Sequence, residues 1–155
     1  MDKFVIVNGG TQKQRWLVED IAWWFCDKYF NRFKSWNIEI DLEKIEGKVQ
    51  GWCMHIDGNA CHVTIDKRLK GDDFITCVLH ELVHVKQHLK KELKERRPDS
   101  QEMWKGKKII QEYYNYYDLP WEKEAYELQE TLLKEYKNCL LYTSDAADDM
   151  QCVDL

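Results

Sequence analysis

Residues 74–84 constrain the fold more than any other stretch of the chain. The first half, Phe74–Leu79, is apolar on nearly every side, which predicts a helix buried among other elements. The second half reads His80-Glu81-Leu82-Val83-His84. Residues four apart on an α-helix lie about 40° apart around the axis and one turn along it, so both imidazoles can reach one ion. We expect Asp72 or Asp73 to cap this helix, which is predicted to run to about Leu93.

The residue types in this pattern are those of a catalytic zinc site. Zinc binds imidazole nitrogens at about 2.0–2.1 Å, so His80 and His84 are the predicted ligands. Glu81 projects about 100° from His80, where it can hold a metal-bound water instead of the metal. Zinc lowers the pKa of that water, and Glu81 is expected to act as the general base. The alternative is a helix that carries two histidines on one face without a metal.

A catalytic zinc needs a third protein ligand. His88 continues the spacing, but it lies about 12 Å along the axis from His80, so the two cannot share an ion on one straight helix. A later helix, expected from Asp118 to about Asn138, offers a better candidate. Its predicted buried stripe consists of Trp121, Ala125, Leu128 and Leu132.

Glu124 lies beside this stripe, whereas Glu122 lies on the other flank and Glu127 turns outward. We therefore expect Glu124 to be the third metal ligand. The alternative for Glu124 is an exposed glutamate on a charged helix.

The motif His80-Glu81-x-x-His84 followed by Glu124-Ala125 resembles that of zincin metallopeptidases of the gluzincin type. The runs His80–Gln87 and Pro120–Ala125 are similar to those of minimal phage- and bacteria-associated metallopeptidases. This likeness covers about residues 60–130. It implies a Zn²⁺-dependent peptidase that acts on a peptide or protein substrate, and it points to Glu124 as the ligand through the alanine that follows.

The resemblance also implies how substrate is held. The strand before the active-site helix, Cys61–Asp66, is expected to be a sheet edge that pairs with an extended peptide. A polar side chain is expected to stabilise the oxyanion, and Tyr113, Tyr114, Tyr116 and Tyr117 are equal candidates, with a packing role as the alternative for each. Alternative functions are a zinc amidase or endopeptidase acting on cell-wall peptides, and a non-catalytic binding module stabilised by zinc.

The remaining patterns predict an α+β domain, with a small antiparallel sheet packed on the active-site helix and with N-terminal and C-terminal helices. A short strand over residues 4–7 precedes a helix from Thr11 to about Phe33. The strand-like stretches Asn37–Leu42, Lys48–Ile56 and Cys61–Asp66 predict an antiparallel meander, with a hairpin turn at Asp57-Gly58.

Length and charge restrict the class of protein. The 155 residues suit one domain, and the net charge of −5 argues against a nucleic-acid partner. No apolar run approaches the roughly 18 residues of a membrane span, and no signal peptide is recognisable, so a cytoplasmic protein is expected, in the host cytoplasm if phage-encoded. The segment from Cys139 resembles a translated transposase-end sequencing adaptor. We therefore expect a native domain over residues 1–138 and a non-native tail over 139–155.

Overall fold

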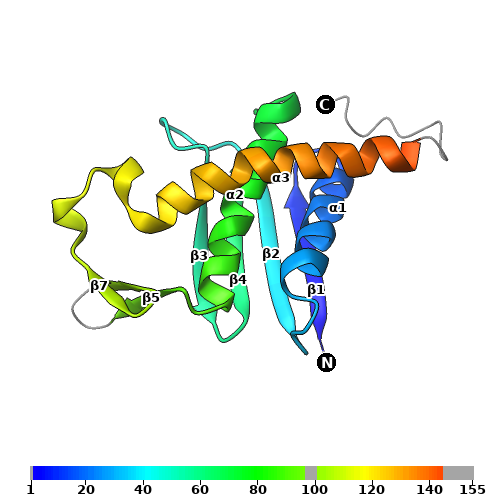
Figure 1. Cartoon of the computed structure of the whole chain (residues 1–155). Coiled ribbons are helices and arrows are strands. Elements are labelled where there is room, and N and C mark those ends of the chain that lie inside the picture. Colours follow the sequence, from blue (N-terminus) through cyan, green and yellow to red (C-terminus); the bar gives the residue numbers. More distant parts are fainter. Residues whose placement is uncertain (1, 97–100, 145–155) are drawn as a thin grey trace.

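The computed structural model describes residues 2–96 and 101–144. The chain has the α+β architecture that the sequence predicts (Figure 1). Along the first half lie β1 (Lys3–Gly9), α1 (Gln12–Tyr29), β2 (Trp36–Glu43), β3 (Gly51–Asp57), β4 (Ala60–Asp66) and α2 (Gly71–Leu89). The second half contains β5 (Leu93–Arg96), β6 (Gln101–Trp104), β7 (Lys107–Ile109), the short 3-10 helices η1 (Gln111–Tyr113) and η2 (Tyr116–Asp118), and α3 (Pro120–Ser144).

The main sheet is mixed, with the strand order β1-β2-β4-β3. β2 pairs in parallel with both β1 and β4, and only β3 and β4 are antiparallel. The predicted antiparallel meander is therefore wrong. Alternating apolar residues identify a strand and its buried face, but they do not say which strand lies beside it. The predicted hairpin is confirmed, since β3 and β4 are joined through Gly58 at a φ of 51°.

The pairing also changes which strand forms the edge. Cys61–Asp66 lies within β4, which is an inner strand between β2 and β3. The prediction that Cys61–Asp66 forms an open edge is therefore wrong, because β3 covers it. Cys61, Val63 and Ile65 are buried in the core, as suits a central strand. The exposed edge on the side of α2 is β3.

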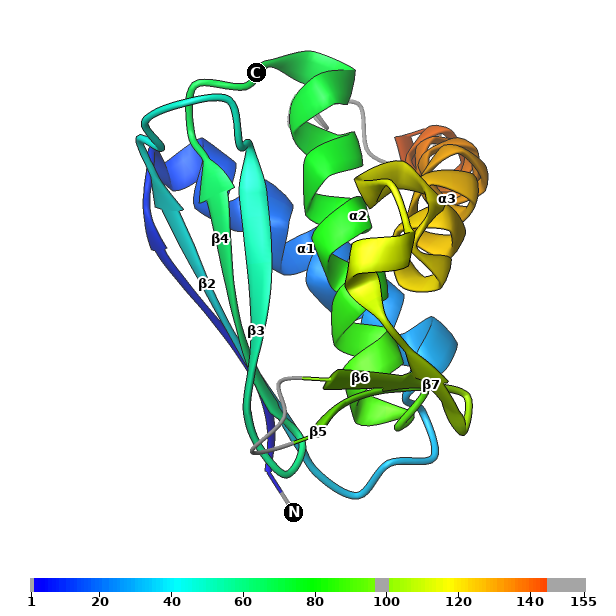
Figure 2. The same ribbon diagram turned by 90° about the vertical axis from the view of Figure 1, so that its left-hand side faces the viewer.

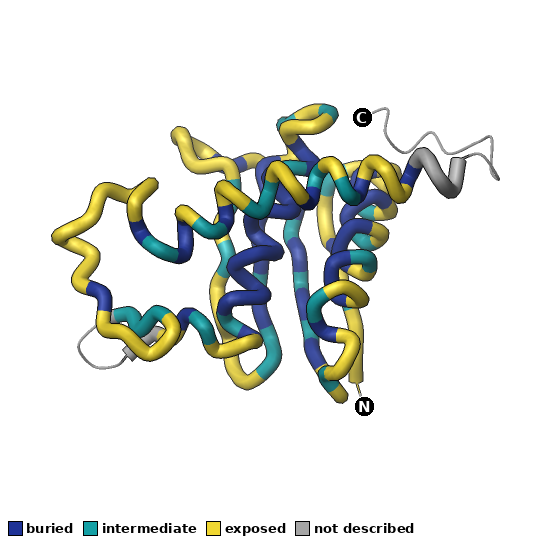
Figure 3. Tube along the Cα trace, in the orientation of Figure 1, coloured by how far each residue is buried: buried dark blue, intermediate teal, exposed yellow. Residues whose placement is uncertain are grey.

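The helices lie on one face of the main sheet (Figure 2). α2 runs between the sheet and α3, and its residues from Phe74 to Gln87 are almost all buried, as Figure 3 shows. Lys70 precedes α2 without a side-chain cap, so the predicted cap by Asp72 or Asp73 is wrong. Both aspartates instead lie in the first turn, where their charge favours the positive end of the helix dipole. α2 ends at Leu89 because the chain leaves to form β5.

A second, antiparallel sheet of β5, β6 and β7 lies between α2 and α3 in sequence. The sequence did not predict this sheet, because its strands carry no clear alternation of apolar and polar residues. It carries a small apolar cluster of its own, formed by Leu93, Ile109, Leu119 and Trp121, against which Trp104 packs.

α3 continues beyond the expected end at Asn138, to Ser144. Leu140 is only 8% exposed and belongs to the main core. The first residues of the expected non-native tail are therefore part of a packed helix, while 145–155 lie outside the described residues. Over the part of the chain that the structure describes, no helix is both long enough and apolar enough to cross a membrane.

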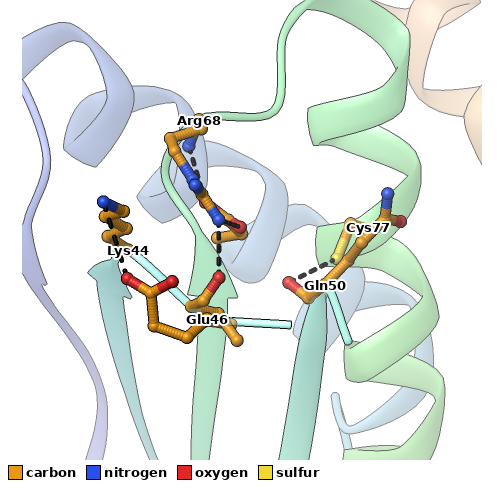
Figure 4. A network of polar contacts seen from close by, with 7 residues as sticks. Lys44, Glu46, Gln50, Arg68 and Cys77 are labelled. Atoms are coloured by element: carbon orange, nitrogen blue, oxygen red, sulfur yellow. Dashed lines mark hydrogen bonds and ion pairs between the residues drawn. The ribbon is translucent and has the colours of Figure 1, made fainter. Parts of the chain in front are cut away.

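The loop between β2 and β3 is fixed against the segment that leads into α2 (Figure 4). Arg68 donates to the Ile45 carbonyl at 2.5 Å and to both oxygens of Asp66. The Gln50 carbonyl accepts from the Asp66 amide at 2.9 Å and from the Cys77 thiol at 3.5 Å. These contacts place the start of β3 directly beside α2.

Candidate metal centre

Three buried side chains converge where α2 and α3 cross. His80 Nε2 lies 3.1 Å from Glu122 Oε1, and His84 Nε2 lies 3.2 Å from Glu122 Oε2. The three residues are 6–8% exposed. Two atoms that bind one tetrahedral zinc at about 2.0–2.1 Å are about 3.3 Å apart, so this donor set fits a zinc ion.

The structure brings Glu122, not Glu124, to the two histidines. The prediction of Glu124 as the third ligand is therefore wrong. Glu124 Oε1 accepts from Lys86 Nζ and from Gln87 Nε2, each at 3.1 Å, and Lys105 Nζ lies 3.7 Å from its other oxygen.

Helix geometry explains why the buried stripe of α3 was predicted and why the choice between Glu122 and Glu124 was not. Trp121, Ala125 and Leu132 are buried as the predicted stripe requires. Glu122 and Glu124 flank this stripe on opposite sides, and the sequence does not say which flank faces His80 and His84. The direction in which α3 crosses α2 decides this, and the cations around Glu124 hold that side chain away from the histidines.

Each histidine is held through its other ring nitrogen. His80 Nδ1 lies 2.7 Å from Gln129 Oε1, and His84 Nδ1 lies 2.8 Å from Gln87 Oε1. An amide oxygen can only accept, so both Nδ1 atoms carry a proton and both Nε2 lone pairs point toward Glu122 when the rings are neutral. Such contacts orient metal-binding histidines.

Gln87 is fully buried and also connects the two helices. Its amide donates to the Trp121 carbonyl at 2.9 Å as well as to Glu124. Glu124 is thus linked to the site indirectly, because Gln87 donates to Glu124 and also contacts His84. Sequence reasoning noticed Gln87 only as part of a family-like motif and missed Gln129; an amide one turn from a ligand was the available signal for Gln87.

The charges in the cluster are strongly coupled. Burial opposes ionisation of Glu122, but hydrogen bonds with His80 and His84 outweigh burial and lower the pKa of Glu122 to about 2. Burial alone would lower the pKa of His84, whereas contact with Glu122 and the charge of Glu81 raise it overall. A site that holds this much negative charge against two imidazoles suits a cation.

Glu81 lies next to the ligands but outside the group of three. It is 6% exposed, and burial raises its pKa despite the opposing effect of His84 and His80. A raised pKa brings a carboxylate closer to the value at which it exchanges protons near neutral pH. Glu81 is therefore a candidate general base.

A groove opens beside Glu81, between β3 and α3. Two cavities, of about 220 and 900 Å³, share Gly51, Glu81 and Tyr116 in their walls. A Cβ atom on Gly51 would lie 2.9 Å from the Thr64 carbonyl oxygen and 3.3 Å from Glu81 Cγ. A residue without a side chain therefore lets the edge strand pass close to Glu81.

The structure distinguishes the four candidate tyrosines. Tyr116 lines both cavities, in the neighbourhood of Glu122. Burial, followed by the charge of Glu122, raises its pKa, so Tyr116 keeps its proton. Tyr117 also lines the larger cavity and packs on Tyr126, while Tyr113 is 80% exposed. Tyr116 is thus the best-placed hydroxyl donor.

The other histidines lie elsewhere. His88 stacks on His55 and does not join the group formed by His80, His84 and Glu122, as helix geometry predicts. His62 lies on the main sheet near Glu39 and Asp41. Its Nε2 lies 2.8 Å from Asp41 Oδ2, a contact that holds the ring on the sheet.

The chain matches no protein family model, no curated protein and no solved structure.

Proposed function

We propose that this protein is a zinc-dependent peptidase, with His80, His84 and Glu122 as the metal ligands and Glu81 as the general base. The observation that carries the proposal is the convergence of two oriented imidazoles and one carboxylate beside a second, buried carboxylate. When bound, the ion would supply Lewis-acid chemistry that lowers the pKa of a water and polarises a carbonyl.

Residues of the chain would supply proton transfer, stabilisation of the oxyanion and binding of the peptide. Glu81 accepts the proton of the attacking water and can return it to the leaving amine. The Tyr116 hydroxyl donates to the oxygen that becomes negative as the carbonyl is attacked. β3 presents its free edge to an extended peptide, which would lie antiparallel or parallel to it along the groove.

A catalytic zinc site is favoured over a structural zinc site. A structural zinc site normally has four protein ligands, whereas a catalytic site has three and an open position. Within residues 2–96 and 101–144, the group at the helix crossing contains three ligands and no fourth His, Cys or carboxylate. The adjoining groove supplies the space that a substrate requires.

The test is substitution of the base without loss of the metal. Glu81→Gln should retain one zinc per chain and lose at least about 10²-fold in peptide cleavage, because an amide cannot accept the proton. The exposed Glu127→Gln on α3 is the matched control and should keep full activity. Cleavage is followed by mass spectrometry on a peptide library, with cell-wall peptides included. An active, zinc-loaded Glu81→Gln protein would reject the mechanism.

A further inference from the structure

The smaller cavity extends from the metal centre toward the second sheet. His84, Glu81 and Glu122 form one side of it, and Glu102 of β6 and Trp121 form another. Its volume is about 220 Å³. At about 30 Å³ per water-sized group, this space accommodates on the order of seven non-hydrogen atoms. That is the size of one long amino-acid side chain.

Glu102 occupies an unusual position in the small sheet. It pairs with Ile109 across the ladder and lies two residues before Trp104, which pairs with Leu93. Paired residues, and residues two apart on a strand, share one face of a sheet. Glu102 therefore lies on the face that carries Leu93 and Ile109 of the apolar cluster, opposite Glu95 of β5.

One oxygen of the Glu102 carboxylate has no hydrogen-bond partner among the described residues. This atom, Oε2, is buried, and no described residue donates a hydrogen bond to it. A buried acceptor that is left unpaired costs free energy, and Glu102 lines the cavity, so a hydrogen-bond donor brought by a ligand would be favoured there.

The other described walls do not supply a positive charge. Among the described residues, no lysine or arginine lines the cavity. The remaining histidine, His88, is neutral at pH 7, because burial and then the nearby His55 and His84 lower its pKa to about 4. Glu122 is itself one of the proposed metal ligands, and Glu81 lies beside them. Glu102 is thus a carboxyl group without a cationic partner among the described residues.

We infer that Glu102 is a specificity-determining residue, and that the smaller cavity binds a cationic nitrogen of the peptide substrate next to the bond that is cleaved. Charge-assisted hydrogen bonds from an ammonium or guanidinium group would satisfy the Glu102 carboxylate. The cation is the side chain of a lysine or arginine, or the α-ammonium of the peptide. This inference depends on the proposed peptidase function for its substrate, but the cation site itself does not.

The cleavage experiment uses the full, zinc-loaded chain and a set of peptides that differ at one position flanking the scissile bond. Peptides with lysine or arginine there should be cleaved faster than matched norleucine or glutamate peptides. Acetylation of the peptide N-terminus distinguishes the sources, since it removes the preference only if the α-ammonium is bound. Glu102→Gln should lower kcat/KM for the basic peptides by about 10-fold or more and leave the norleucine peptides unchanged.

Two further variants sharpen the result. Glu102→Lys should reverse the preference toward acidic peptides, which a loss of folding cannot imitate. Glu112→Gln, an exposed substitution on η1, should behave as wild type. Active protein without a basic preference, or an unchanged preference in Glu102→Gln, would overturn the inference.

A binding measurement keeps the inference testable if no peptide is cleaved. Butylguanidinium is titrated into the full chain while the indole N–H signals of Trp52 and Trp121, which line the cavity, are followed by NMR. If cleavage is absent, saturable shifts that Glu102→Gln abolishes support the cation site, although the peptidase proposal has failed. Shifts that are absent, or equal in Glu102→Gln, would then reject the cation site.

Discussion

Glu122 and Glu124 lie two residues apart at the start of α3, yet their surroundings differ completely. Glu122 forms ion pairs with the imidazoles of His80 and His84, whereas Glu124 forms ion pairs with Lys86 and Lys105. From the sequence, the residue types and spacing on α2 were sufficient to predict His80 and His84 as a pair. The choice between the two glutamates was not, because it depends on how α3 crosses α2 and on lysines far away in the sequence.

These surroundings predict opposite effects on zinc binding. Glu122→Ala removes a ligand atom, so the purified protein should retain little zinc after dialysis. Glu124→Ala leaves all three ligands in place and should retain one zinc per chain. Zinc content is measured by atomic emission for both variants and the wild type. A protein in which Glu124→Ala loses zinc and Glu122→Ala keeps it would contradict the ligand assignment.

At the scale of elements, the features set by neighbouring residues were predictable. The β3–β4 hairpin, the buried α2 and the stripe of α3 follow from a turn signal and from helical periodicity. The parallel pairing of β2 with β4 was not predictable, since it depends on a crossover connection. Nor was the small sheet of β5–β7, whose strands are short and carry few apolar residues.

The connection from β4 into α2 has its own pH dependence. The Arg68 guanidinium lowers the pKa of Asp66 to about 2, below its ordinary value of 3.8. A carboxyl group whose pKa is lower in the folded state contributes stability above its unfolded pKa, and this contribution is lost as the pH falls.

Asp66→Asn should therefore lower Tm at pH 7, and the difference from wild type should shrink as the pH falls from about 4 to 2. Thermal unfolding followed by circular dichroism at several pH values measures this. The exposed Asp27→Asn on α1 is the control and should parallel wild type throughout. A difference in Tm that stays constant from pH 7 to 2 would show that Asp66 acts through something other than its charge.

At the scale of the whole molecule, the core lies between one face of the main sheet and the helices, and α3 reaches across it as far as Leu140. The adaptor-like composition after Asn138 predicted a tail without contacts. Composition could not show that the helical register of α3 would carry on and bring Leu140 onto the same buried side as Leu132 and Tyr136.

Leu140→Ala should therefore destabilise the protein by about 2 kcal/mol, near the lower end for a buried leucine, because this residue lies near the end of a helix. Urea unfolding measures the change, and the exposed Lys134→Ala on the same helix is the control. A change below about 0.5 kcal/mol, typical of surface substitutions, would support the view that this segment does not pack.

If His80, His84 and Glu122 bind the metal as proposed, the division of these ligands between α2 and α3 has a kinetic consequence. The hairpin and α2 form from contacts between close neighbours in the chain, whereas Glu122 reaches His80 only after a loop of 42 residues has closed. An ion that needs all three ligands would bind the native state more tightly than the folding transition state. Bound metal would then chiefly lower the unfolding rate, and the lifetime of the folded protein would increase with the free zinc concentration.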